Sequence, residues 1–332
     1  MSAPPPHIGV LLVNLGTPEA PTAGAVRRYL AEFLSDRRVV EIPPFVWQPI
    51  LRGIILNTRP RKSARAYAEV WTDQGSPLAA ITAAQAQGLQ ARLGGQITVR
   101  WAMRYGNPGI AAALPSLVAD GCDRILIAPL YPQYSGATTA SAMDSVGAAL
   151  AGMRRQPAIR TLPPYYAEPT HIAALHADIT RQLAALPFRP EVLLLSFHSM
   201  PERTQRLGDP YYDQCLETAR LLGEALADSG LRLETCFQSR FGRAKWLEPA
   251  TGATIAAEAR RGTRRLAIVA PGFAADCLET REELAIRGRA QFLAAGGTDF
   301  AVLDCLNAGE TGMAMLEALV RRELAGWTLI YS

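Results

Sequence analysis

One histidine in the sequence stands where chemistry could take place. His198 follows the unbroken apolar run of residues 192–195, and Pro201 ends the strand that this run predicts. A strand buried on both faces is typical of a parallel sheet, and ligands bind at the carboxyl end of such strands in open α/β folds. On position alone, a histidine bonded to a backbone group is an equally good interpretation.

A row of carboxylates lies in residues 270–283, where a second buried strand ends and a helix begins. Glu279 and Glu283 are four residues apart and share a helix face, where their like charges repel slightly. The pair could relay protons or bind a cation, although a solvated acidic face is the commoner arrangement. Asp276 is expected to cap the helix. An imidazole with a carboxylate suits ferrous iron, and it suits proton transfer equally well.

The remaining motifs exclude several common enzyme classes. His7 lies in the N-terminal tail, and His171 and His176 are five residues apart, which puts them off a common helix face. No GxGxxG, GxxxxGK[ST] or GxSxG pattern occurs, so a nicotinamide dehydrogenase, a nucleotide hydrolase and an α/β-hydrolase are all disfavoured.

Predicted strands alternate with predicted helices throughout, which indicates an α/β fold with parallel sheets. The two halves echo each other, because residues 104–106 resemble 240–242 and residues 125–129 resemble 266–271. This predicts two similar α/β domains that face one another across a cleft. Residues 36–60 are rich in proline and aromatics and are expected to form an irregular or short-helical excursion.

Composition sets the class of protein. The chain has 332 residues, of which 49% are hydrophobic and 19% charged, so it predicts a globular protein of two domains. The formal charge is +4, and Lys62 and Lys245 are the only lysines. Arginine binds carboxylates and phosphates bidentately, which hints at an anionic ligand, although a solvated arginine surface is commoner. No long basic run occurs, so nucleic acid is not indicated.

Cysteine usage and the N-terminus favour a cytoplasmic protein. No CxxC pair occurs, and five scattered cysteines are typical of thiols in a reducing compartment. The first residues show no signal peptide, and no apolar run is long enough to span a bilayer. Residues 42–56 could touch a membrane surface or line the mouth of a pocket, and a partly buried amphipathic helix is an equally good interpretation. The cysteines are Cys122, Cys215, Cys236, Cys277 and Cys305.

Several short stretches together resemble the ferrochelatase family. They follow the family's order over nearly the whole chain, and their combination is far more specific than any single motif. Their proline and aromatic positions are similar to those of the Gram-negative bacterial type. The stretches are residues 13–18, 103–106, 129–135, 195–203, 208–211, 237–242, 246–249 and 271–280.

The resemblance implies an enzyme that inserts ferrous iron into protoporphyrin IX, the last step of protoheme synthesis. It implies two Rossmann-like domains, each a parallel β-sheet flanked by helices, with the porphyrin in the cleft between them. Residues 1–162 would form the N-terminal domain, with residues 36–60 as a lip over the active site. Residues 163–306 would form the C-terminal domain, and residues 307–332 a helix that packs back on the first domain.

The family's functional residues carry over onto matching positions of this sequence. His198 would be the essential histidine, which takes a pyrrole proton, binds the iron, or does both. Glu279 would be its acidic partner and a second iron ligand, and Asp276 and Glu283 would belong to the same polar path. The residues that would contact or flank the macrocycle are Leu15, Arg104, Tyr105, Trp246 and Phe273.

The chain departs from the family pattern at two positions. Some members have histidine where Cys277 stands and a third acidic residue where Arg287 stands, so the acidic row is shorter here. Members with an iron–sulfur cluster use additional cysteines, in animals at the C-terminus, and residues 326–332 contain none. We therefore expect no cluster and no tightly bound cofactor, with ferrous iron as a substrate.

Two alternatives stay open. One is the same chelation on coproporphyrin III, and the other is a non-catalytic tetrapyrrole carrier, which would need no base. A metallohydrolase is less favoured, because further histidine ligands are missing. The expected partners are protoporphyrin IX and ferrous iron, without nucleic acid; peripheral membrane contact is an open alternative, and the sequence does not indicate an oligomeric state.

Overall fold

The computed structural model describes residues 7–240, 242 and 244–327, and it divides into two compact units. Among the described residues, the first unit holds His7–Leu130, Gly136–Pro163 and Met313–Trp327, and the second holds Tyr131–Ser135 and those from Pro164 to Gly312. The predicted boundaries are 162/163 and 306/307, whereas the two units place Pro163 in the first and residues 131–135 and 307–312 in the second.

Hydrogen bonds explain why the loop Tyr131–Ser135 belongs to the second unit. Nε2 of Gln133 donates to the Thr218 hydroxyl at 2.9 Å, and the backbone nitrogen of Tyr134 donates to Oε1 of Gln214 at 2.7 Å. Both acceptors lie on one helix of that unit, α9 (Tyr211–Ala225).

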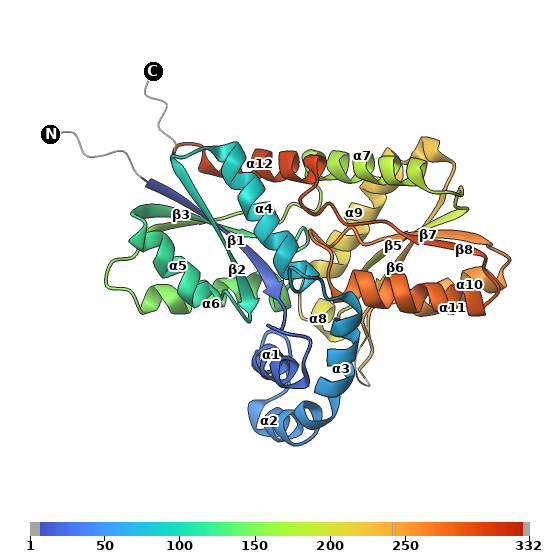
Figure 1. Cartoon of the computed structure of the whole chain (residues 1–332), viewed down its shortest axis with the longest axis horizontal. Helices are drawn as coiled ribbons and strands as arrows, with labels where there is room; N and C mark the ends of the chain where they lie inside the picture. Colours follow the sequence, from blue (N-terminus) through green and yellow to red (C-terminus); the bar gives the residue numbers. More distant parts are fainter. Residues whose placement is uncertain (1–6, 241, 243, 328–332) are drawn as a thin grey trace. The chain divides into compact units, whose positions relative to one another are not determined.

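The first unit is built on a four-stranded parallel sheet with the order β2-β1-β3-β4. Its central strand is apolar and buried on both faces, as a parallel sheet covered by helices requires. Helices α5 and α6 lie on one face, and α4 lies on the other beside α12 (Figure 1). The bounds are β1 (His7–Gly16), β2 (Ile97–Tyr105), β3 (Cys122–Pro129), β4 (Ala158–Thr161), α4 (Pro77–Leu93), α5 (Ile110–Ala119), α6 (Ser141–Ala151) and α12 (Glu310–Leu324).

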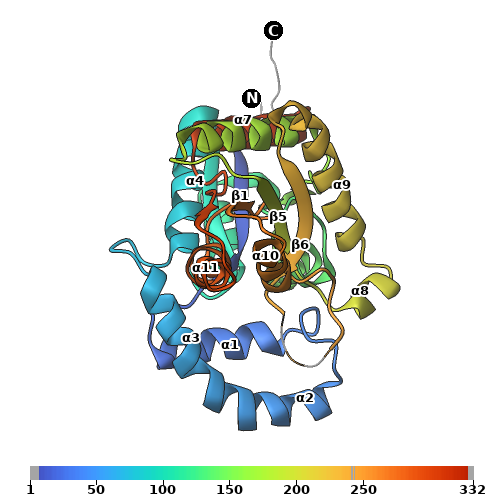
Figure 2. The ribbon, with the colours of Figure 1, turned by 90° about the vertical axis from the view of Figure 1, so that its right-hand side faces the viewer.

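The second unit repeats this plan with the strand order β6-β5-β7-β8, again all parallel. Helix α10 covers β5 and β6 on one face, and α7 and α9 lie on the other (Figure 2). The two sheets have the same order of strands along the chain, so the predicted pair of similar α/β domains is confirmed. The bounds are β5 (Val192–His198), β6 (Arg232–Gln238), β7 (Arg265–Val269), β8 (Asp299–Val302), α7 (Pro169–Ala185), α8 (Glu202–Arg206), α10 (Thr251–Arg260) and α11 (Arg289–Ala294).

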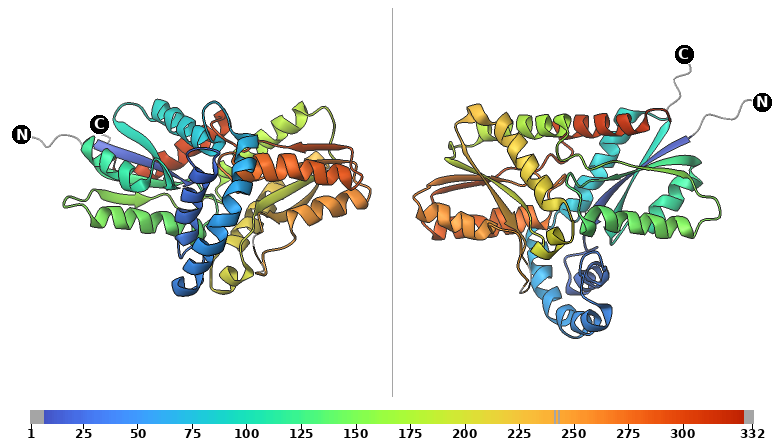
Figure 3. Two further views of the ribbon diagram at one scale, coloured as in Figure 1. Left: turned by 60° about the horizontal axis from the view of Figure 1, so that its bottom comes forward. Right: turned by 180° about the vertical axis from the view of Figure 1, so that it is seen from behind.

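A helical arm follows β1 and contains the segment that we expected to form an irregular or short-helical excursion. The arm is helical apart from residues 36–43, and its helices pack on one another (Figures 1 and 3). Pro44 stands in the first turn of its second helix, where proline favours a helix start, and Nε1 of Trp47 donates to the carbonyl of Leu34 at 2.6 Å. The arm consists of α1 (Ala23–Ser35), α2 (Pro44–Ile50), the π-helix η1 (Leu51–Ile55) and α3 (Leu56–Val70).

Three helices have details that bear on the site. Pro115 lies inside α5, which runs unbroken over Ile110–Ala119. The short helix α8 precedes α9, which ends at Ala225. The helical segment that follows β7 contains the π-helix η4 (Glu279–Gly288). Among the described residues, none of the helices combines the length and apolarity needed to cross a membrane.

Candidate functional site

His198 is the last residue of β5, so the carboxyl end of a buried strand presents it as predicted. The imidazole is half-buried and lies edge-on to the ring of Phe273, with ring centroids 6.4 Å apart and planes at 62°. The next residue is fixed, because the backbone nitrogen of Ser199 donates to the Gln238 carbonyl at 2.7 Å and its hydroxyl to the Leu247 carbonyl at 3.2 Å. The strand end therefore holds the histidine firmly.

Glu279 follows β7, the strand that pairs with β5 in the second sheet. Parallel strands end at the same edge of a sheet, so Glu279 and His198 come from neighbouring strand ends. The Glu279 side chain is half-buried and accepts a hydrogen bond from the Cys277 thiol. Burial and this carboxylate raise the pKa of the Cys277 thiol well above its ordinary value, so the thiol stays protonated as a donor.

Asp276 does not cap the helix, contrary to our expectation. The helix begins at Glu279, and the buried Asp276 carboxylate binds side chains instead of a backbone N–H of the first turn. It accepts hydrogen bonds from the Thr280 hydroxyl at 2.7 Å, from Nη2 of Arg281 at 2.8 Å and from Nδ2 of Asn307 at 2.6 Å. These bonds anchor the turn before Glu279.

Glu283 and its neighbours are also engaged with protein groups. The Glu283 carboxylate accepts hydrogen bonds from the backbone nitrogen and the hydroxyl of Ser239. In the π-helix η4, side chains five residues apart lie about one turn apart, so Arg287 can reach Glu282. Nη2 of Arg287 lies 2.8 Å from Oε2 of Glu282 and 3.7 Å from Oε2 of Glu283. The acidic row thus ends in an ion pair at Arg287.

The second unit supplies two of the predicted macrocycle contacts. Phe273 is half-buried in the turn after β7, beside His198. Trp246 is half-buried in the loop before α10, where its backbone bridges to Pro201. Its indole N–H is buried, with no hydrogen-bond partner in the described part of the chain. Both rings lie on segments that begin at the same sheet edge as His198.

The first unit supplies the other three predicted macrocycle contacts, Leu15, Arg104 and Tyr105, at the carboxyl ends of β1 and β2. Leu15 is half-buried near the end of β1. The strand ends approach closely, because a Cβ at Gly16 would lie 1.9 Å from the carbonyl oxygen of Tyr105. Tyr105 itself is fully buried, whereas the Arg104 side chain beside it is 17% exposed. Contact of Tyr105 with a macrocycle stays a prediction. In the structure, the Tyr105 ring packs beneath the guanidinium of Arg104.

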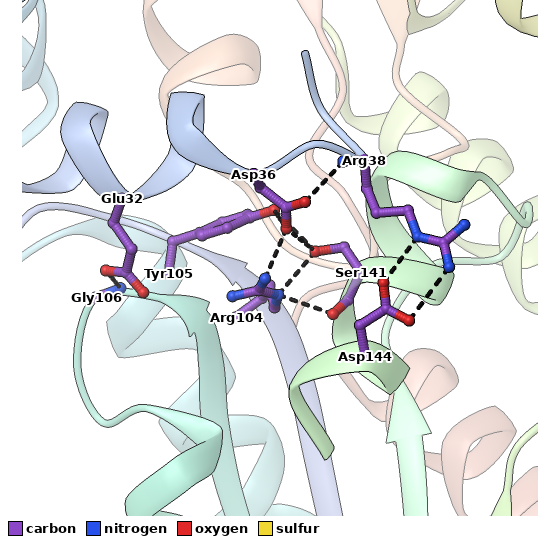
Figure 4. A network of polar contacts seen from close by, with 8 residues as sticks. All are labelled: Glu32, Asp36, Arg38, Arg104, Tyr105, Gly106, Ser141 and Asp144. Atoms are coloured by element: carbon purple, nitrogen blue, oxygen red, sulfur yellow. Dashed lines mark hydrogen bonds and ion pairs between the residues drawn. The ribbon is translucent and has the colours of Figure 1, made fainter. Parts of the chain in front are cut away.

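Asp36 is the centre of a polar network around these two residues (Figure 4). Its Oδ2 accepts hydrogen bonds from Nη2 of Arg104 at 2.6 Å, from the Tyr105 hydroxyl at 2.8 Å and from the Ser141 hydroxyl at 2.6 Å. Its Oδ1 accepts one from the backbone nitrogen of Arg38 at 2.7 Å. Burial opposes ionisation, but the hydrogen bonds and the Arg104 charge hold the pKa of Asp36 below its ordinary value.

The sequence patterns did not identify Asp36 as a site residue, although its position at the end of a predicted helix could have drawn attention to it. Asp36 stands at the C-terminal end of α1, where the helix dipole disfavours a negative charge. A carboxylate in that position needs a cationic partner, and Arg104 provides it from far along the chain. No motif connects the two residues, so only the fold brings them together.

Metal binding at the second sheet edge would involve few protein ligands. In the regions that the structure describes, no group of three His, Cys, Asp or Glu side chains is placed to hold a metal ion. An imidazole and a carboxylate from adjacent strand ends can hand on a proton or bind a divalent ion in passing.

A sequence model of the ferrochelatase family matches residues 7–324. This chain belongs to the ferrochelatase family. Over 330 residues it is 51% identical to the ferrochelatase of Methylocella silvestris, with 97% of this chain and 95% of that protein covered. It is 50% identical to the ferrochelatase of Brucella ovis, with 98% and 94% covered. The family predicted from the motifs is therefore confirmed.

Solved structures show the same chelatase fold at low sequence identity. SirB from Bacillus subtilis with Fe3+ matches with a TM-score of 0.57 and 13% identity, and 96% of both chains is covered. The sirohydrochlorin chelatase SirB from Bacillus subtilis subspecies spizizenii in complex with cobalt matches with a TM-score of 0.54 and 11% identity, over 95% of this chain and 94% of that one. At such identities the likeness shows the fold alone.

Proposed function

We propose that this protein inserts ferrous iron into protoporphyrin IX to give protoheme, the final step of heme biosynthesis. The observation that carries the proposal is the ferrochelatase family match over residues 7–324. The positions of His198 and Glu279 after adjacent strands of one sheet support it. The reaction is that of a lyase, in which two pyrrole protons leave as the metal enters.

His198 is the proposed acceptor of a pyrrole proton. An imidazole titrates near neutral pH, and a well-placed base typically contributes a rate factor of about 10²–10⁴. Phe273 limits the movement of the His198 ring, and the fixed backbone of Ser199 limits the movement of the strand end. Glu279 would receive the proton from His198 and pass it toward solvent, which returns the imidazole to its basic form.

Ferrous iron is the second substrate, and His198 and Glu279 are its proposed transient ligands. Four pyrrole nitrogens replace them as the metal enters the macrocycle, so the protein needs no complete ligand set. We propose that the enzyme holds no iron–sulfur cluster and no tightly bound cofactor. Purified protein would then contain well under one equivalent of iron and of acid-labile sulfide, and a stoichiometric amount of either would overturn this part.

We propose that the macrocycle is contacted or flanked by Leu15, Arg104 and Tyr105 of the first unit and by Trp246 and Phe273 of the second. These residues lie at or after the carboxyl ends of strands, where α/β folds bind ligands. Aromatic and aliphatic side chains suit a flat apolar ring. Asp276 and Glu283 support Glu279 and the end of β6 through the hydrogen bonds described above.

We propose that the helical arm makes peripheral contact with a membrane and that the protein is located in the cytoplasm. Residues 42–68 contain five basic and no acidic residues. Phe45 is 82% exposed and Ile54 58% exposed on the same segment. Apolar and basic side chains together bind anionic lipid surfaces. Phe45→Ser should reduce cosedimentation with phosphatidylglycerol vesicles, and equal sedimentation of both proteins would contradict the contact. Five buried thiols suit a reducing compartment.

Anaerobic incubation of the purified protein with protoporphyrin IX and ferrous iron tests the function. The porphyrin absorption spectrum should convert to that of heme at a rate proportional to enzyme concentration. A parallel reaction with coproporphyrin III tests the nearest alternative, which a higher kcat/KM on that substrate would favour. Tight porphyrin binding without any metal insertion would overturn the proposal and indicate a carrier.

A further inference from the structure

The partly buried ion pair of Asp36 and Arg104 takes no part in the transfer of protons or iron proposed above. We infer that Asp36 is a specificity-determining residue, which favours porphyrins with two carboxylates over porphyrins with four. The inference rests on the proposed function, and in particular on Arg104 lying against the bound porphyrin. Asp36 acts through Arg104, whose charge it balances.

The contact between the two residues is short and shielded from solvent. Nη2 of Arg104 lies 2.6 Å from Oδ2 of Asp36, and the side chains are 17% and 11% exposed. The lowered pKa of Asp36 keeps the carboxylate ionised at neutral pH. One positive and one negative charge at this distance cancel for any ligand that approaches from further away.

Further hydrogen bonds fix the direction of the guanidinium. Nε of Arg104 donates to the carbonyl of Ser141 at 2.9 Å and to its hydroxyl at 2.7 Å. The guanidinium carbon lies 4.4 Å above the centre of the Tyr105 ring. Two of the guanidinium nitrogens are therefore committed to protein acceptors, and the group cannot turn to a substrate carboxylate without breaking this network.

The surroundings of the pair add no positive charge. Arg38 pairs with Asp144 through Nε at 2.8 Å and Nη2 at 3.2 Å, and Glu32 accepts a hydrogen bond from the backbone nitrogen of Gly106 at 2.9 Å. The charged side chains of the cluster in Figure 4 are two arginines and three carboxylates, which gives a net charge of 2 − 3 = −1.

This balance disfavours carboxylate-rich substrates. Protoporphyrin IX carries two propionates, and coproporphyrin III carries four, with propionates in place of the two vinyl groups. A propionate placed beside this cluster would lose water and meet no unbalanced cation, which is costly. A vinyl group at the same place loses little. Discrimination of this kind comes from a penalty against the wrong substrate as well as from contacts with the right one.

The test is the ratio of kcat/KM on coproporphyrin III to kcat/KM on protoporphyrin IX. Asp36→Asn leaves the Arg104 charge unbalanced, so the ratio should rise about tenfold. Asp144→Asn is the matched control, because it removes the same charge from an exposed pair, and its ratio should stay within about twofold of the wild type.

A double variant separates a charge effect from general damage to the fold. Asp36→Asn combined with Arg104→Leu restores the charge balance, and its ratio should return toward that of the wild type. Arg104→Leu alone leaves Asp36 unbalanced, and its ratio should fall. A purely structural role for Asp36 would not be rescued by removal of the arginine. If Asp36→Asn fails to fold, the inference is tested by Arg104→Leu alone. A fall in its ratio of kcat/KM on coproporphyrin III to kcat/KM on protoporphyrin IX supports the inference, and an unchanged ratio overturns it.

The failures of the two proposals are distinguishable. Unchanged ratios in folded Asp36→Asn and Arg104→Leu, with normal iron insertion into protoporphyrin IX, overturn the inference and leave the proposed function intact. Absence of insertion into either porphyrin by the wild type overturns the function, and the inference fails with it.

Discussion

Glu283 accepts two hydrogen bonds from Ser239, one from the backbone nitrogen at 2.9 Å and one from the hydroxyl at 2.6 Å. Ser239 directly follows β6, whose last residue, Gln238, pairs with His198. Glu283 therefore holds the strand end next to the histidine. Glu283 thus supports the strand end, whereas Glu279 is the residue that we propose acts on protons or iron.

The two glutamates should therefore respond differently to neutral substitution. Glu283→Gln should lower the free energy of unfolding by about 1–3 kcal/mol, because it weakens charge-assisted bonds to Ser239, and should reduce turnover by less than about tenfold. Glu279→Gln should reduce turnover by about 100-fold or more with little effect on stability. Urea unfolding and steady-state kinetics measure both quantities. The opposite ranking would contradict this division of roles.

The strand ends of the first sheet should tolerate no side chain at Gly16. Its φ of +131° is rare for other residues, and a Cβ would clash with the carbonyl of Tyr105 at 1.9 Å. Gly16→Ala should cost about 3 kcal/mol or more of unfolding free energy. Gly147→Ala in α6 is the control, with no neighbour within 4 Å, and it should stabilise by about 0.5–1 kcal/mol. Equal stability of the two variants would refute the close approach.

His171 should make stability fall in mild acid. Burial lowers its pKa from 6.5 to about 4, so the folded protein keeps it neutral while the unfolded chain takes up a proton. Stability from this group is complete above pH 6.5 and is lost as pH falls toward about 4, by about 3 kcal/mol in total. In His171→Gln this loss should be absent, so the two unfolding curves converge at low pH. Parallel curves between pH 7 and pH 4 would count against the buried neutral histidine.

The cysteines should be unreactive in the folded protein. All five are buried, and burial is the largest cause of the raised pKa of each thiol. Alkylation depends on the thiolate, so iodoacetamide at pH 8 should leave the native protein unmodified within minutes and label all five thiols in urea. Mass spectrometry counts the labels. Rapid native labelling of Cys277 would show that its contact with Glu279 is open to solvent.

Local patterns predicted the frame of the second sheet. The apolar runs at residues 192–195 and 266–270 correspond to β5 and β7, because strands buried on both faces must be apolar along their length. Pro201 cannot donate a ladder hydrogen bond, so it marks the end of the first of these strands and located His198. The family motifs then supplied the partner, Glu279, because no spacing rule links the two strands.

Other features depend on contacts that no local pattern encodes. Asp36 reaches Arg104 and Ser141 only after β2 and α6 are in place, and the partners lie 68 and 105 residues away. The prolines of the arm left irregular and short-helical structure both open, and the hydrogen bond from Trp47 to Leu34 that joins α2 to α1 could not be read from the local pattern. The π-helical form of η4 also escaped prediction, because a sequence pattern that predicts a helix does not specify whether its hydrogen bonds span four or five residues.

The most direct test of the central claim is iron insertion by His198→Ala, measured anaerobically on protoporphyrin IX beside the wild type and a His176→Ala control. We expect that His198→Ala folds and still quenches porphyrin fluorescence, but forms heme at least about 100-fold more slowly, while His176→Ala matches the wild type. Heme formation by His198→Ala at the wild-type rate would contradict the assignment of the histidine at the end of β5 as the group that takes the pyrrole proton.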